Sequence, residues 1–263
     1  MTMDQLSPET LQLIGYFTHL KIGTNNVPVP YFNNRRVQVR GALRVNIGKG
    51  NPRDIKEELK ILSLREKIDL REFSSEQISK FLVDHHIGID CSGLAYYILD
   101  TELQARGYGT LKKNITFPFA KNPLRKLLAW LRPVENCGVS TLAHEVNSVL
   151  VELKDVQPGD MIVMLNAGPR KDYNHVAVIL NVAKNPGGSE VITYVHSFKY
   201  PTDGLYNHGV REESIEIIKP NGPLTEQKWN EEKMSQYVKT AEKVEIRRLR
   251  CFLSFRAERN EVK

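Results

Sequence analysis

The sequence predicts an α+β fold in which a helix that begins at a cysteine packs on an antiparallel sheet. Two observations predict it. Directly after Asp90 and Cys91, apolar residues recur at helical spacing, at Leu94, Ala95, Ile98 and Leu99. Further on, two β-branched runs at 174–180 and 191–198 are joined by turn residues, which is the pattern of a hairpin.

The segments before Cys91 predict mostly helices. Ser7 and Pro8 have the residue types of a helix cap and a first helical position, so we expect a first helix over 7–20. The remaining segments are each bounded by turn or capping residues. They are strands at 36–40 and 43–47, a turn at 48–52, a charged helix at 53–68 and a helix capped by Ser74 or Ser75.

The stretch 118–133 is basic and apolar, and it predicts a short amphipathic helix. Three roles are open for it: a lid over a cleft, a contact with an anionic polymer, or an ordinary surface helix. We favour the last, with Trp130 packed inward.

The C-terminal half predicts further elements on the same core. In chain order they are a helix at 141–153, a strand after the turn at 157–160, the hairpin, a strand at 209–218, a helix from Thr225 and a closing strand at 244–255. We expect an N-terminal helix and loop (1–30), a central domain with helical insertions (31–218) and a C-terminal helix and strand packed on it (219–263).

Cys91 occupies a position that suits a nucleophile. Asp90 is a good N-cap residue, so Cys91 lies in the first helical turn, where free N–H groups and the helix dipole favour thiolate. Its own backbone N–H would face a developing oxyanion. The alternative is a buried cysteine that only opens a core helix.

A cysteine nucleophile needs an imidazole to accept its proton and a group to orient that imidazole. His175 opens the first strand of the hairpin, and His196 lies near the end of the second. The hairpin would place the two histidines side by side.

Three blocks of the chain resemble the NlpC/P60 cysteine peptidases. They are Asp-Cys-Ser-Gly-Leu at 90–94, Pro-Gly-Asp at 158–160 and His-Val-Ala-Val-Ile at 175–179, followed by a polar residue on the next strand. The similarity spans about residues 88–198. The family usually has a Tyr just before its Asp-Cys-Ser-Gly motif. Here 81–86 holds that place, and Tyr31 supplies the Tyr only if a long insertion intervenes.

The resemblance implies a papain-like core and hydrolysis of amide bonds in short cell-wall peptides, often at a γ-D-glutamyl bond, without a cofactor. Carried over by motif, Cys91 is the nucleophile, His175 the general base and His196 the orienting residue. We expect substrate contacts from Tyr31, His86, Asp90, Ser92 and Tyr200. Amidase or acyltransferase activity on another acyl group stays open.

Two rival functions stay open, one prompted by charge and one by the long insertions, the basic helix and the absence of a visible signal peptide. The net charge of +6 permits attraction to acidic polymers, but no nucleic-acid motif is visible, so we expect no nucleic-acid partner. A non-catalytic binding module, for example a phage or toxin component that retains the fold, is the other.

Three cysteines indicate a reduced compartment rather than a disulfide framework, and none has metal-ligand spacing. No apolar run is long enough for a membrane span. No signal peptide is visible, so we expect a cytoplasmic protein or release by a signal-independent route.

Overall fold

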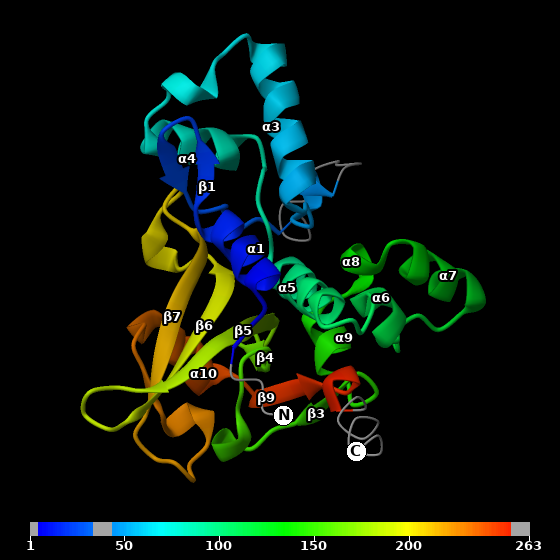
Figure 1. The fold of residues 1–263 in the computed structure, drawn as a ribbon, viewed down its shortest axis with the longest axis vertical. Coiled ribbons are helices and arrows are strands. Elements are labelled where there is room, and N and C mark those ends of the chain that lie inside the picture. The colour runs from blue at the N-terminus through cyan, green and yellow to red at the C-terminus, as the bar shows by residue number, and fades with distance from the viewer. Residues whose placement is uncertain (1–4, 34–43, 254–263) are drawn as a thin grey trace.

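A seven-stranded antiparallel sheet forms the centre of the molecule (Figure 1). The computed structural model describes residues 5–33 and 44–253, and in that part the strand order is β3-β9-β4-β5-β6-β7-β8. The strands are β3 (Ser148–Leu150), β4 (Met161–Ala167), β5 (Tyr173–Lys184), β6 (Glu190–Phe198), β7 (Gly209–Ile217), β8 (Lys228–Trp229) and β9 (Lys243–Leu249).

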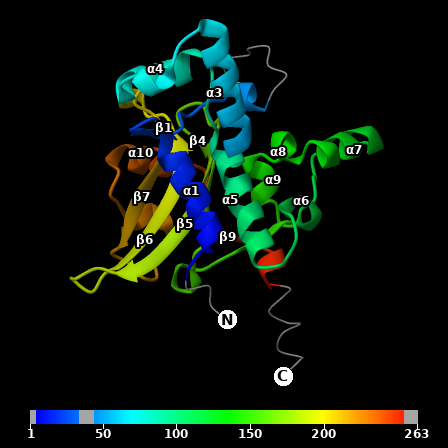
Figure 2. The same cartoon turned by 45° about the horizontal axis from the view of Figure 1, so that its top comes forward.

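Helices cover both faces of this sheet. Helices α1 (Pro8–Thr18) and α5 (Cys91–Ala105) lie side by side over one face (Figure 2), and α10 (Glu232–Thr240) packs on the other. The remaining elements flank these layers. They are α3 (Pro52–Glu66), α4 (Ser75–Asp84), α6 (Leu111–Asn114), α7 (Pro123–Leu131), α8 (Pro133–Asn136), α9 (Val139–Ala143), the small hairpin of β1 (Leu20–Ile22) and β2 (Asn25–Val27), and 3-10 turns η1 (Val45–Ile47), η2 (Leu70–Glu72), η3 (Leu153–Asp155), η4 (Pro201–Asp203) and η5 (Leu224–Glu226).

Strand β5 separates two apolar cores. Val176 and Val178 pack with Cys91 and α5, whereas Ala177 and Ile179 pack in the core under α10. Successive side chains of a strand point to opposite faces. Because both faces are covered, this stretch is apolar at every position instead of alternating with polar residues.

The α+β class is confirmed, and several helices form as the sequence predicts. Ser7 caps α1 and Ser74 caps α4 through their side chains. Helix α5 begins at Cys91 behind its Asp90 cap and buries Leu94, Ala95, Ile98 and Leu99. The expected helix 53–68 is found as α3.

Several expectations are wrong. Residues 45–47 form a 3-10 turn rather than the end of a strand, and the expected strand 36–40 lies outside the described residues. The expected helix 141–153 is the short α9 followed by strand β3, because Ser148 pairs with β9. Trp130 is 52% exposed instead of packed inward.

Two C-terminal expectations are corrected as well. Helix α10 begins at Glu232 rather than at Thr225. Strand β9 ends at Leu249, and it lies inside the sheet, between β3 and β4. No helix in the described ranges has the length and apolar character that crossing a bilayer requires.

Candidate active site

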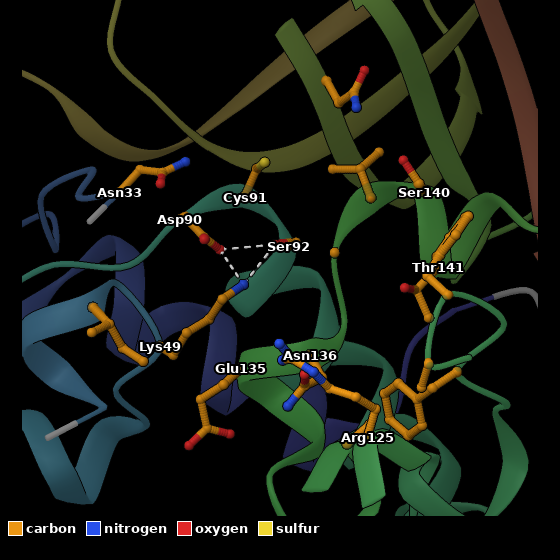
Figure 3. A pocket seen from close by; sticks show the side chains of 18 of the residues that line it. Asn33, Lys49, Asp90, Cys91, Ser92, Arg125, Glu135, Asn136, Ser140 and Thr141 are labelled. Atoms are coloured by element: carbon orange, nitrogen blue, oxygen red, sulfur yellow. Dashed lines mark hydrogen bonds and ion pairs between the residues drawn. The ribbon is translucent and has the colours of Figure 1, made fainter. Parts of the chain in front are cut away.

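A cavity of about 1280 Å³ opens at the start of α5 (Figure 3). Cys91, its neighbours Asp90 and Ser92, Tyr31 and Lys49 form one side of it. Residues between 117 and 141, from the segment that carries α7 to α9, also line it, as do residues 172–174 at the start of β5, Asn33 and Ile47. Segments far apart in the sequence therefore enclose one sulfur atom.

The turn that presents Cys91 is held by three hydrogen bonds. The Asp90 carboxylate accepts from the N–H of Gly93 at 2.6 Å, as an N-cap does. The N–H of Asp90 donates to the carbonyl of Gly48 at 2.9 Å. The hydroxyl of Ser197 on β6 donates to the carbonyl of Ile89 at 2.7 Å. The helix start is therefore fixed to both the η1 loop and the sheet.

Lys49 lies beneath this turn, and sequence reasoning missed it. Its Nζ donates to Asp90 Oδ1 at 2.8 Å and to Ser92 Oγ at 2.6 Å (Figure 3). The side chains of Lys49 and Asp90 are only 8% and 10% exposed. The visible signal was Gly48-Lys49-Gly50, which has the wrong spacing for a phosphate loop. The glycine at 48 permits the close approach, because a Cβ there would lie 2.1 Å from the carbonyl oxygen of Phe32.

The expectation that Cys91 has a lowered pKa is wrong. Burial raises the pKa of the Cys91 thiol to about 12, and the charge of Asp90 contributes to the rise. The N–H groups of Val176 and Ser92 and the charge of Lys49 oppose the rise without cancelling it. Cys91 is therefore a neutral thiol at neutral pH, and any attack by its sulfur must be coupled to loss of the proton.

We expect alkylation of Cys91 by iodoacetamide to speed up steadily with pH. Since its pKa is about 12, the thiolate fraction rises about tenfold per pH unit below that value. Peptide mass spectrometry after timed labelling at several pH values measures the rate. A rate that is already at its plateau at neutral pH would show a thiolate–imidazolium pair and contradict the neutral thiol.

The structure brings His175 and His196 together, as the hairpin predicts. Nε2 of His175 lies 2.9 Å from Nδ1 of His196, and both side chains are fully buried. Their rings pack against Phe198, with centroids 4.9 and 5.7 Å from it. Phe198 belongs to the core under α10, so both imidazoles lie on that face of the sheet.

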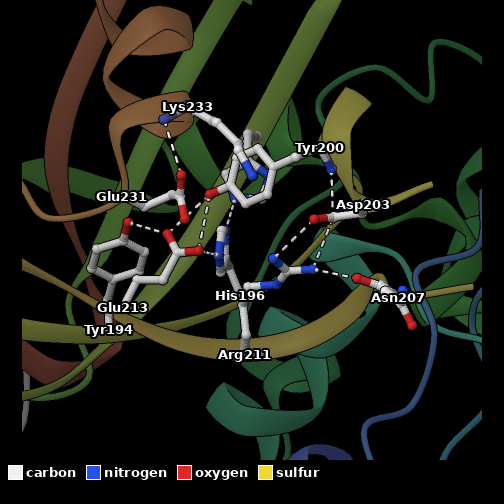
Figure 4. Close-up of polar contacts among 10 residues, drawn as sticks. Tyr194, His196, Tyr200, Asp203, Asn207, Arg211, Glu213, Glu231 and Lys233 are labelled. Carbon is white, nitrogen blue, oxygen red and sulfur yellow. Dashed lines mark hydrogen bonds and ion pairs between the residues drawn. The ribbon is translucent and has the colours of Figure 1, made fainter.

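Glu213 on β7 extends this pair to a row of three groups, and it too was missed; Figure 4 shows Glu213 beside His196. Its Oε1 lies 3.3 Å from Nε2 of His196. Its carboxylate also accepts from the hydroxyls of Tyr194 at 2.8 Å and Tyr200 at 2.9 Å. Glu213 lies in a predicted strand with polar residues on either side, so the sequence gave no sign that its side chain is only 9% exposed.

The three groups favour one arrangement of protons on the rings of His175 and His196. A carboxylate only accepts, so it favours a proton on Nε2 of His196. Nδ1 of His196 then accepts from Nε2 of His175, which leaves a lone pair on Nδ1 of His175. That nitrogen is buried and makes no hydrogen bond among the described residues. Nε2 of His196 also fails the geometry of a hydrogen bond, but it has the Glu213 carboxylate at 3.3 Å as a charged neighbour. The row therefore ends in an unused base.

Burial and neighbouring contacts together determine whether His175 and Glu213 are charged at neutral pH. Burial and the neighbouring His196 hold the pKa of His175 well below its usual value, so the ring is neutral at neutral pH. Burial pushes the pKa of Glu213 upward, but contacts with His196, Tyr194 and Tyr200 keep it below its usual value. Glu213 is therefore ionised opposite His196.

Cys91 contacts β5 next to His175, but no hydrogen bond joins the two side chains. The sulfur accepts from the backbone N–H of Val176, the residue next to His175. Strand β5 pairs with β6 only from Val178 onward. The sulfur reaches β5 in the stretch before Val178, where β5 is not paired with β6. The free Nδ1 of His175 makes no bond to the thiol.

Only some of the residues expected to contact substrate line the cavity. Tyr31 lines the cavity beside Asp90 and Ser92, and it forms a bridge to Ile89 despite the long insertion between them. His86 does not line it; its ring stacks on Phe32 at 5.3 Å. Tyr200 is 0% exposed, so its expected contact with substrate is wrong. It supports Glu213 instead.

Comparisons with known proteins do not assign a family. No family model matches the chain, and neither the curated proteins nor the solved structures contain a match. Among residues 5–33 and 44–253, no cluster of three or more His, Cys, Asp or Glu side chains has the arrangement of a metal site. Function is therefore inferred from the geometry of the site.

Proposed function

We propose that the protein is a cysteine hydrolase of amide bonds, with Cys91 as nucleophile and His175 as general base. The observation that carries the proposal is the row Glu213–His196–His175, which ends in a free, neutral imidazole nitrogen one residue from the peptide N–H that contacts the Cys91 sulfur. A buried polar atom without a partner is unusual, and a proton-accepting role explains it.

In the proposed reaction the proton of the thiol moves to Nδ1 of His175 as sulfur attacks the substrate carbonyl. The C–S bond forms, the C–N bond breaks, and the leaving amine takes the proton from His175. Water then attacks the thioester, giving a proton to His175, and the sulfur recovers a proton as the acid leaves. The thiol–imidazole contact that this reaction needs forms when substrate binds, as catalytic hydrogen bonds that are loose in the free enzyme tighten in the complex.

For the substrate we propose short cell-wall peptides, on the basis of the resemblance to the NlpC/P60 peptidases. The cavity suits a polar peptide, because Tyr31, Asn136, Ser140 and Thr141 line it together with Cys91 and offer hydrogen-bonding groups.

The direct test is incubation with purified cell-wall peptides, read by mass spectrometry of both peptides and protein. We expect cleaved peptides, and an acyl adduct on the tryptic peptide that contains Cys91 when the reaction is quenched early with acid. An adduct on Cys137 or Cys251, or cleavage that leaves no adduct and proceeds after Cys91 is alkylated, would refute the proposal.

One observation favours a second candidate, a binding module without catalysis. The raised pKa of Cys91 and the missing thiol–imidazole hydrogen bond are the properties of an unreactive cysteine. Under this alternative the peptides bind without turnover, and binding persists after Cys91 is replaced. Calorimetry beside the cleavage assay distinguishes the two.

A further inference from the structure

Helix α7 and the loop before it carry a large apolar surface that the fold does not cover. We call residues 117–132 the basic-apolar arm. Leu124 and Trp130 are 66% and 52% exposed. Phe119, Leu127, Leu128 and Leu131 are also exposed. Exposed apolar patches of this kind usually mark a binding surface.

The arm projects from the rest of the molecule. Figures 1 and 2 both show α7 at the outer edge, beyond α6 and α8. Ala129 is the one residue of α7 that is buried. The helix therefore gains little from packing on its own fold, and its apolar residues need another explanation.

The arm and its surroundings are also uniformly basic. From Leu111 to Val134 the sequence contains six basic residues and no acidic one. The basic residues are Lys112, Lys113, Lys121, Arg125, Lys126 and Arg132. Nζ of Lys112 lies 3.5 Å from the ring centroid of Trp130, so cations and apolar side chains share one surface.

We propose that the basic-apolar arm docks the protein on the surface of an anionic lipid bilayer. A short amphipathic helix with Trp and Leu on its apolar side and Lys and Arg beside them lies in the plane of the membrane interface. Leu and Trp side chains enter the headgroup boundary, and the cations meet the acidic lipids, each contributing about 1 kcal/mol near such a surface.

The apolar residues favour a bilayer over a soluble polyanion. Nucleic acid and anionic polysaccharide are held mainly by charge, and they would leave Leu124, Leu127 and Leu131 uncovered. A bilayer accepts both kinds of side chain at once. The helix lies on the membrane and does not cross it, since α7 has only nine residues.

Docking by the arm would hold the cavity beside the membrane. Arg125 and Ala129 of α7 line the same cavity as Cys91. A substrate anchored in or near the membrane would then be delivered to the cavity. The docking proposal itself does not depend on the hydrolase proposal.

The test is co-sedimentation of the full chain with vesicles of phosphatidylcholine, with and without a third of phosphatidylglycerol. We expect binding to the acidic vesicles only. Tryptophan emission reports the contact, because Trp130 is exposed whereas Trp229 is 6% exposed. The emission should shift to the blue on binding, and W130F should remove the shift while retaining most of the binding.

Two variants and two matched controls decide the outcome. R125E/K126E and L127S/W130S should each weaken vesicle binding by about tenfold or more. On α3, K56E/K60E changes exposed charges and I61S/L64S changes apolar residues that are 56% and 71% exposed; both should bind as the parent does. Three results would overturn the proposal: equal weakening by the α3 variants, binding of heparin or DNA but not vesicles, or self-association that L127S/W130S abolishes without any vesicle binding.

Discussion

Cys91→Ala is expected to reduce amide hydrolysis by at least about 10⁴-fold, since removing the nucleophile leaves only binding and electrostatic contributions. His175→Ala should cost a similar factor, and the double variant little more, because the two residues act in one proton transfer. Initial rates of peptide cleavage at saturating substrate measure all three.

Variants of the other two residues in the row, His196 and Glu213, are expected to have smaller effects on the rate. Glu213→Gln and His196→Ala should lower kcat by about 10²-fold with KM nearly unchanged, because they position His175 without touching substrate. Cys251→Ala is the matched control and should keep full activity, since Cys251 lies outside the cavity lining. Undiminished cleavage by Cys91→Ala would end the hydrolase proposal, whatever Glu213→Gln does.

Lys49→Met is expected to lower the free energy of unfolding by about 3 kcal/mol, because it leaves the buried Asp90 carboxylate without its charged partner. Lys49→Met/Asp90→Asn should recover part of the loss, since no unpaired charge remains. Urea denaturation followed by circular dichroism gives both values.

The matched control for Lys49 is an ion pair on the surface. Lys154 and Glu152 are 68% and 73% exposed, and Lys154→Met should leave the denaturation midpoint almost unchanged. If Lys49→Met is as harmless as Lys154→Met, the cluster under Cys91 is not a structural support for the helix start. The single variant should also slow alkylation of Cys91, because the charge of Lys49 lowers the pKa of that thiol.

The sequence predicts the parts of this molecule that depend on local pattern. Spacing of apolar residues places α5, and the capping chemistry of Asp90 sets its first residue. The hairpin of β5 and β6 brings His175 beside His196, as its sequence pattern predicts, although the register shifts between Ile179 and Asn181. These features need only neighbours along the chain.

The missed features depend on long-range packing. Lys49 meets Asp90 across 41 positions of sequence, and Glu213 reaches His196 through strand pairing on a different hairpin. The sign of the pKa shift of Cys91 was missed because a helix start favours thiolate, whereas burial, which outweighs it, is a property of the whole fold. Trp130 was expected inward because apolar periodicity indicates one face of a helix, not what covers it.

Strand β5 lies between the two apolar cores, so its residues contact both. Under the proposed mechanism, peptides meet the sulfur from the side of α5, and the thiol proton passes to His175, which is fully buried with His196 on the side of α10. Substrate recognition and proton transfer would then depend on residues on opposite faces of the sheet. Changes in α7 to α9 can alter which molecule is accepted without disturbing the base, and changes beneath α10 can retune the base without altering what is accepted.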